Sequence, residues 1–116
     1  MSTLTLQIKK EFLDKILSGE KTEEFREIRP KNSKKYIEYI QAENDEDVQP
    51  IQYKQIQFFN GYAKDRPEVM IDVKKSIIQI IEDENGEDIV YEEDGQEYVV
   101  AQMVYSLGKI ISRKNI

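Results

Sequence analysis

The chain of 116 residues contains no cysteine and no histidine. Without cysteine the protein has no disulfide and no thiol nucleophile, which agrees with a reducing compartment. Without histidine it cannot use imidazole as an acid or base, form the usual serine triad, or build the common zinc sites. We therefore expect a cytoplasmic protein that uses neither a metal nor a cofactor.

Long apolar runs are also absent from the sequence. Short runs such as Ile77-Ile78 and Ile80-Ile81 fall far short of the roughly 20 residues that span a bilayer. The first residues, Met1 to Leu4, lack a charged region followed by an apolar one, so we expect no signal peptide and no membrane partner. The length predicts a single domain, residues 1–116, with a modest core.

The net charge of -6 is unevenly distributed. Residues Met1 to Ile40 carry nine basic and seven acidic side chains, whereas Gln41 to Ile116 carry eight basic and sixteen acidic ones. Nine of those acids fall between Glu82 and Glu97, with no basic residue among them. The excess negative charge is therefore local, and a basic face that binds nucleic acid is allowed elsewhere.

The acidic stretch is interpreted as a solvated β-hairpin. Asn85-Gly86 and Asp94-Gly95 are strong turn dipeptides, and Asp88 to Tyr91 between them has the pattern of a short strand. A carboxylate metal cluster and a nucleic-acid mimic are the alternatives. The spacing of a calcium-binding loop is absent, which disfavours the first of these.

Periodicity and turn residues predict two helices and six or seven strands. A polar stretch closed by proline, Gln41 to Pro50, is expected to be a loop. We expect an α+β fold, a small mixed β-barrel with both helices packed at its rim. The expected helices are Lys10 to Ser18 and about Ser33 to Ile40, and the expected strands are Leu4 to Ile8, Thr22 to Ile28, Gln55 to Phe59, Val69 to Lys74, Ile77 to Glu82 and Tyr98 to Tyr105.

The most informative segment is Gly19 to Arg26, which reads G-x-K-T-x-E-x-R. Alternation along a strand places Thr22, Glu24, Arg26 and Ile28 on one face, and Lys21 lies directly before the first of these residues. A cation, a carboxylate and a guanidinium on one rigid element can recognise a planar group with donors and acceptors, such as a nucleobase, or a phosphate. The alternative is that Glu24 and Arg26 pair with neighbours on an exposed strand.

A second candidate element follows Phe59. In Asn60-Gly61-Tyr62 an amide can read a base edge, the glycine allows close approach, and the aromatic ring can stack. Lys64 and Arg66 can then hold phosphates. The alternative is a tight turn whose tyrosine covers the end of the barrel.

The order of strand, short helix, glycine and charged strand resembles the ASCH domain, a small barrel of the PUA-like group. The resemblance covers the whole chain and is greatest with the compact versions found in bacteria and phages. It continues through Glu27 to Pro30, Ile56 to Arg66, Tyr98 to Tyr105 and Leu107 to Ile110. It implies an RNA-binding or modified-nucleotide-binding module. The residues assigned to that site are Lys21, Glu24, Arg26, Arg29, Asn60, Gly61, Tyr62, Lys64 and Arg66.

The resemblance also implies an alternative, a hydrolase. One ASCH branch deacetylates N4-acetylcytidine with a lysine in the position of Lys21 and a threonine three residues later. Here Glu24 stands in the place of that threonine, so the mechanism carries over only if Thr22 or another hydroxyl substitutes. Another branch cleaves RNA, for which Lys21, Tyr62 and Ser106 could supply comparable groups. A third class is a protein-interaction module whose acidic hairpin captures a basic partner.

Overall fold

The computed structural model describes residues 3–41 and 46–116. By its internal contacts the chain divides into two compact units, each assembled from separate segments. Unit 1 comprises Met1–Glu24, Gln52–Ser76 and Tyr105–Ile116, and unit 2 comprises Phe25–Ile51 and Ile77–Val104. The single domain expected from the chain length stays a prediction.

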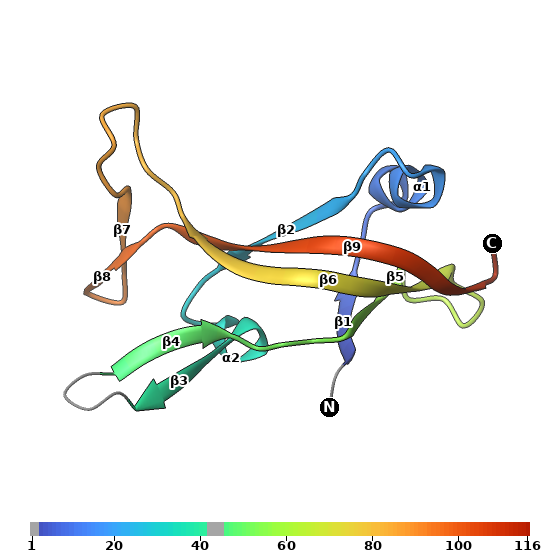
Figure 1. Ribbon diagram of the computed structural model, residues 1–116, viewed down its shortest axis with the longest axis horizontal. Helices are drawn as coiled ribbons and strands as arrows, with labels where there is room; N and C mark the ends of the chain where they lie inside the picture. Colours follow the sequence, from blue (N-terminus) through green and yellow to red (C-terminus); the bar gives the residue numbers. More distant parts are fainter. Residues whose placement is uncertain (1–2, 42–45) are drawn as a thin grey trace. The chain divides into compact units, whose positions relative to one another are not determined.

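The elements follow one another as β1 (Thr3–Gln7), α1 (Lys10–Ser18), β2 (Glu23–Ile28), α2 (Ser33–Tyr36), β3 (Ile37–Gln41), β4 (Glu46–Pro50), β5 (Gln55–Phe59), β6 (Glu68–Ile80), β7 (Val90–Glu93), β8 (Gln96–Val99) and β9 (Ala101–Lys114). The main sheet has the strand order β1-β5-β6-β9-β2 (Figure 1). Strand β1 is parallel to β5, and β5 is antiparallel to β6. The hairpins β3–β4 and β7–β8 form two further antiparallel sheets.

The predicted α+β fold, a small mixed β-barrel with two helices at its rim, is wrong. The described part of the chain is mostly β, with 56% strand and 12% helix, and its main sheet stays open. Strands β1 and β2 are the two edges of that sheet, with three strands between them. Closure would need these edges to pair, and within residues 3–41 and 46–116 no such pairing is present.

The core of unit 1 is formed where the inward-facing residues of three neighbouring strands line up. Leu6 of β1 pairs in register with Phe58 of β5, which pairs with Val69 of β6, and all three are buried. A second row of buried residues lies beside the first, in which Leu4 of β1 pairs in register with Ile56 of β5, and Ile56 pairs with Ile71 of β6. Helix α1 has the predicted bounds and buries Leu13 and Ile16. It ends at Gly19, whose φ of 84° favours a residue without a Cβ.

In unit 2 the second helix is much shorter than predicted. Helix α2 is a single turn, and the predicted helical residues from Ile37 onward form strand β3. Isoleucine and tyrosine favour a pleated strand over a helix, and Tyr39 pairs with Val48 of β4. The loop prediction for Gln41 to Pro50 is therefore wrong at Gln41, which ends β3, and at Glu46–Pro50, and residues 42–45 lie outside the described residues.

The acidic stretch forms turns and a hairpin, as predicted. Asp94 and Gly95, with φ of 51° and 78°, make the two-residue loop between β7 and β8. Gly86 also has a positive φ, and the Asp83 carboxylate accepts hydrogen bonds from the backbone of Asn85 and Glu87. Several strand boundaries differ from prediction, and strand β7 (Val90–Glu93) lies two residues later than the strand predicted at Asp88 to Tyr91. Strand β6 is continuous, and the predicted strand Tyr98 to Tyr105 is divided between β8 and β9.

Candidate functional site

Lys21 is held in place by backbone hydrogen bonds on both sides. Its own N–H donates to the carbonyl of Lys15 in α1, at 3.0 Å. The carbonyl of the next residue, Thr22, accepts from the N–H of Leu107 in β9, at 2.9 Å. The backbone at Lys21 is therefore anchored to both the helix and the sheet.

Glu24 is a buried carboxylate in strand β2. Its Oε1 lies 3.2 Å from Nζ of Lys21, and the two side chains are only 7% and 18% exposed. The predicted alternation is confirmed within Glu23–Ile28, where Glu24, Arg26 and Ile28 are less exposed than Glu23, Phe25 and Glu27. Thr22, which was predicted on the same face, is exposed and precedes the strand. Strand β2 thus buries a glutamate and exposes Phe25. Burying ions costs free energy unless they are paired, so the pair compensates for the burial of the carboxylate.

A groove of about 460 Å³ lies beside Lys21 within unit 1. The end of α1, the connection from Gly19 to Thr22, and strands β6 and β9 supply its walls. Most of its side chains are aliphatic, and its charged residues are Lys21 and Lys109. Pockets for small molecules have this size and this mixture of an apolar surface with a few polar groups. The lining residues are Ile16, Leu17, Ser18, Gly19, Lys21, Thr22, Ile71, Leu107, Gly108, Lys109 and Ile110.

The predicted Asn60 to Arg66 element is a loop of the same unit that does not line this groove. The Asn60 amide donates to the carbonyl of Ile8 at 2.9 Å, so it ties β5 to the end of β1. The Arg66 guanidinium stacks on the ring of Phe59, 3.8 Å from its centroid. Gly61 has a φ of 85°, as a turn requires, and Lys64 and Tyr62 are exposed, the tyrosine at 86%. Asn60 and Arg66 therefore have structural contacts.

Arg26 and Arg29 belong to unit 2. Arg26 is half-buried in β2. The guanidinium of Arg29 lies 2.6 Å from Oε1 of Glu27 and 4.2 Å from the ring centroid of Tyr91. The hydrogen bond to Glu27 raises the pKa of Arg29, with smaller contributions from Tyr91 and Glu93. The positive charge of Arg29 is thus largely balanced by its neighbours.

Sequence reasoning missed the residues that complete each pocket. In unit 1 these are Ile71 and the segment from Leu107 to Ile110. In unit 2 they are Tyr39, Tyr91 and Tyr98, which line a second pocket with Arg29. The sequence does contain a signal for the pair Tyr91 and Tyr98, because a two-residue turn at Asp94-Gly95 places these two positions opposite each other in a hairpin. The contribution of β9 depends on long-range pairing, which no local pattern reports.

The two units differ strongly in charge. Unit 1 carries twelve lysines and arginines against eight acids, a net charge of +4, and unit 2 carries five against fifteen, a net charge of -10. Together they account for the total of -6. This division differs from the one along the sequence, because the basic residues from Arg26 to Lys35 belong to the acidic unit 2.

Neither helix in residues 3–41 and 46–116 is long and apolar enough to cross a bilayer. Over the same residues, no three His, Cys, Asp or Glu side chains are grouped as a metal would require. Comparisons with protein-family models, with curated proteins and with solved structures find no match to this chain. The resemblance to the ASCH domain therefore stays a hypothesis based on the residues.

Proposed function

We propose that this protein is a binding module for RNA or a nucleotide, related to ASCH domains, and that its ligand occupies the groove of unit 1. The observation that carries the proposal is the buried Lys21–Glu24 pair at 3.2 Å, next to a groove of about 460 Å³. The pair belongs to the G-x-K-T-x-E-x-R segment on which the resemblance rests.

The chemistry of the pair suits the edge of a nucleobase. The Lys21 ammonium, which lines the groove, is a hydrogen-bond donor, and the Glu24 carboxylate beside it is an acceptor. A ligand with an adjacent acceptor and donor, such as cytosine or adenine, matches both groups. The aliphatic walls contributed by Leu17, Ile71 and Leu107 then contact the face of the base.

The charge of unit 1 suits the phosphates of such a ligand. Lys109 lines the groove, and Lys64 is exposed elsewhere in the same unit. The net charge of +4 on unit 1 attracts a polyanion even though the whole protein is acidic. Binding to single-stranded RNA should therefore weaken with salt by about 0.7 in log affinity per log salt for each phosphate contact.

Fluorescence anisotropy with a labelled ten-nucleotide single-stranded RNA tests the proposal, supported by calorimetric titration with the four nucleoside monophosphates. The informative variants are Glu24→Gln and Lys109→Ala, because both side chains belong to the pair or the groove. Lys75→Ala is the matched control for Lys109→Ala, since Lys75 is an exposed lysine of the same unit outside the groove.

Glu24→Gln and Lys109→Ala are each expected to weaken binding at least fivefold, while Lys75→Ala changes affinity less than twofold. Thermal denaturation of every variant checks that the fold is retained. Equal weakening by Lys109→Ala and Lys75→Ala would mean that only overall charge matters. That result, or an absence of binding by the native protein to both RNA and mononucleotides, would refute the proposal.

A further inference from the structure

Unit 2 contains a pocket of about 380 Å³ that is lined by aromatic side chains. Its walls come from the end of β2, from α2 and β3, and from the hairpin β7–β8. Tyr39, Tyr91 and Tyr98 are the aromatic residues, and Arg29 is the charged one. The lining residues are Ile28, Arg29, Pro30, Ser33, Ile37, Tyr39, Tyr91, Gln96, Tyr98, Val99 and Ala101.

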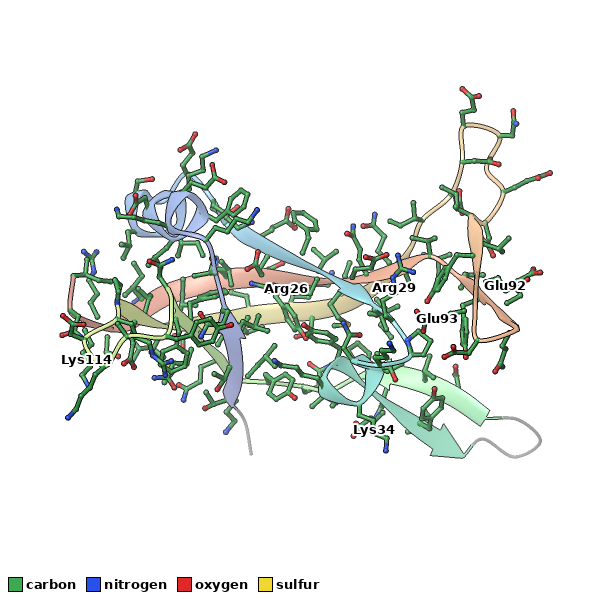
Figure 2. All side chains as sticks on the ribbon, turned by 180° about the vertical axis from the view of Figure 1, so that it is seen from behind. Arg26, Arg29, Lys34, Glu92, Glu93 and Lys114 are labelled. Carbon is green, nitrogen blue, oxygen red and sulfur yellow. The ribbon has the colours of Figure 1, made fainter. Side chains whose placement is uncertain are left out.

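The hairpin presents one ordered face to this pocket. Tyr91 pairs with Tyr98 across the strands, and Glu93 pairs with Gln96. The two tyrosine rings stack with centroids 5.6 Å apart, and the Tyr98 hydroxyl donates to the Gln96 side chain at 3.2 Å. Side chains alternate along a strand, so Glu93 lies on the same face as Tyr91. Figure 2 shows Glu93 on the side of β7 toward Arg29 and Glu92 on the other side.

This face already holds one cation. The guanidinium of Arg29 lies 4.2 Å from the centroid of Tyr91 and forms a 2.6 Å contact with Glu27. Glu93 also acts on Arg29 electrostatically. A cation above a tyrosine ring with carboxylates nearby is a favourable arrangement. Arg29, Glu27 and Glu93 together carry one positive and two negative charges, so this face has a net negative charge.

Tyr39 offers further aromatic surface in the same pocket. It lines the pocket from β3, and its side chain is 64% exposed. An exposed tyrosine beside a partly apolar pocket provides a ring on which a second cation can stack. The aliphatic residues Ile28, Pro30 and Val99 provide a surface for the methylene groups of an arginine or lysine side chain.

From this geometry we propose that the pocket of unit 2 is a docking site for a basic segment of a partner protein, with an arginine or lysine side chain inserted between Tyr39 and the β7–β8 hairpin. The net charge of unit 2, -10, is complementary to such a segment and opposes a phosphate backbone. This site is separate from the nucleotide-binding groove proposed for unit 1 and does not depend on it.

Binding can be measured with a fluorescein-labelled peptide of ten alternating arginine and glycine residues, by anisotropy at physiological salt. A glutamate–glycine peptide, spermidine and single-stranded RNA serve as competitors. The matched variants are Glu93→Gln and Glu92→Gln. Both remove one negative charge from β7, but only Glu93 shares the face of Tyr91. Tyr39→Ala removes the exposed ring, and thermal denaturation verifies that each variant is folded.

Tyr39→Ala and Glu93→Gln are each expected to weaken peptide binding at least fivefold, whereas Glu92→Gln changes it less than twofold. Equal effects of Glu92→Gln and Glu93→Gln would mean a non-specific attraction and would overturn the proposal. So would an absence of peptide binding, displacement of the peptide by spermidine at equal charge concentration, or a loss of RNA binding in Tyr39→Ala.

Discussion

The ammonium of Lys21 lies 3.2 Å from a carboxylate oxygen of Glu24, and both side chains are largely shielded from water. The two residues are three positions apart, where the chain leaves a helix and enters a strand. In an exposed pair of this kind the contribution to stability is small. Burial changes this, because each charge then depends on the other for compensation.

Removing one member of the pair should destabilise the protein strongly. Glu24→Ala leaves the Lys21 ammonium without this partner, and the expected loss in the free energy of unfolding is about 3 to 5 kcal/mol. Urea denaturation followed by circular dichroism measures it. Glu23→Ala is the matched control, because Glu23 is exposed in the same strand and its loss should stay within about 0.5 kcal/mol. Comparable losses in the two variants would show that the pair is not buried in solution.

Replacing both members together separates stability from binding. In the double variant Lys21→Met, Glu24→Leu no buried charge of the pair remains, so stability should recover to within about 1 to 2 kcal/mol of the native protein. RNA binding should not recover, because neither the donor nor the acceptor is restored. A double variant that is stable and still binds with native affinity would remove Lys21 and Glu24 from the site.

Asn60→Ala should lower stability by about 1 kcal/mol, since it removes the hydrogen bond to the Ile8 carbonyl. Because the amide is engaged within the protein, RNA affinity should be unchanged. Tyr62→Ala provides the comparison, because that side chain is 86% exposed and its loss should leave stability unchanged. Thermal denaturation and RNA anisotropy on the same samples check both statements. A more than fivefold loss of RNA affinity in Asn60→Ala would contradict the structural role.

Short-range features of this protein were predicted correctly from the sequence, whereas the prediction that its main sheet closes into a barrel was not. Helix α1, its end at Gly19, and the alternation of β2 depend on short-range patterns, and these predictions are confirmed. The barrel was wrong because closure depends on which strands lie at the edges of the sheet. Helix α2 was overestimated because pairing with β4, which is not visible in the local sequence, decides the conformation of Ile37 onward.

The candidate site residues were likewise brought together as predicted only where they are close in the sequence. Lys21 and Glu24 come together because their spacing is local. The Asn60 to Arg66 loop was assigned to the same site as Lys21, but it lies outside the groove that Lys21 lines. Arg29 was assigned to the predicted site, but Glu27 and Tyr91 already contact its guanidinium. The stacked tyrosines required a strand register that charge patterning alone does not reveal.

Tyr53 should make the protein sensitive to alkaline pH. Burial raises the pKa of Tyr53 above its ordinary value of 10.0, because the phenolate is poorly solvated there. Above pH 10 the unfolded chain releases this proton while the folded protein retains it. The folded state then binds more protons, so stability falls as pH rises through and beyond 10.

The measurement is the free energy of unfolding at pH 9 and at pH 11, for the native protein and for Tyr53→Phe. The decrease between the two pH values should be smaller in Tyr53→Phe. Tyr62→Phe is the control, because that tyrosine is exposed and its removal should leave the decrease unchanged. Identical pH dependence in the native protein and Tyr53→Phe would show that Tyr53 is solvated.

The native protein should not hydrolyse N4-acetylcytidine. The residue three positions after Lys21 is Glu24, and its carboxylate lies against the lysine ammonium where the deacetylase branch of the ASCH group has a threonine. A carboxylate has no hydroxyl proton to lose, so Glu24 cannot act as the hydroxyl nucleophile that a threonine provides. Thr22 lines the groove beside Lys21, so it is the hydroxyl that would have to act in its place.

Chromatography of N4-acetylcytidine incubated with the native protein, Thr22→Ala and Lys21→Met decides the matter. We expect no cytidine above the level of the buffer in any of the three samples. Because Lys21→Met leaves Glu24 without its lysine, thermal denaturation must accompany the assay to show that the variant is folded. Cytidine released by the native protein and lost in both variants would make this chain an enzyme that uses Thr22. The binding-module proposal would then be replaced by a hydrolase whose nucleophile lies two residues before the expected position.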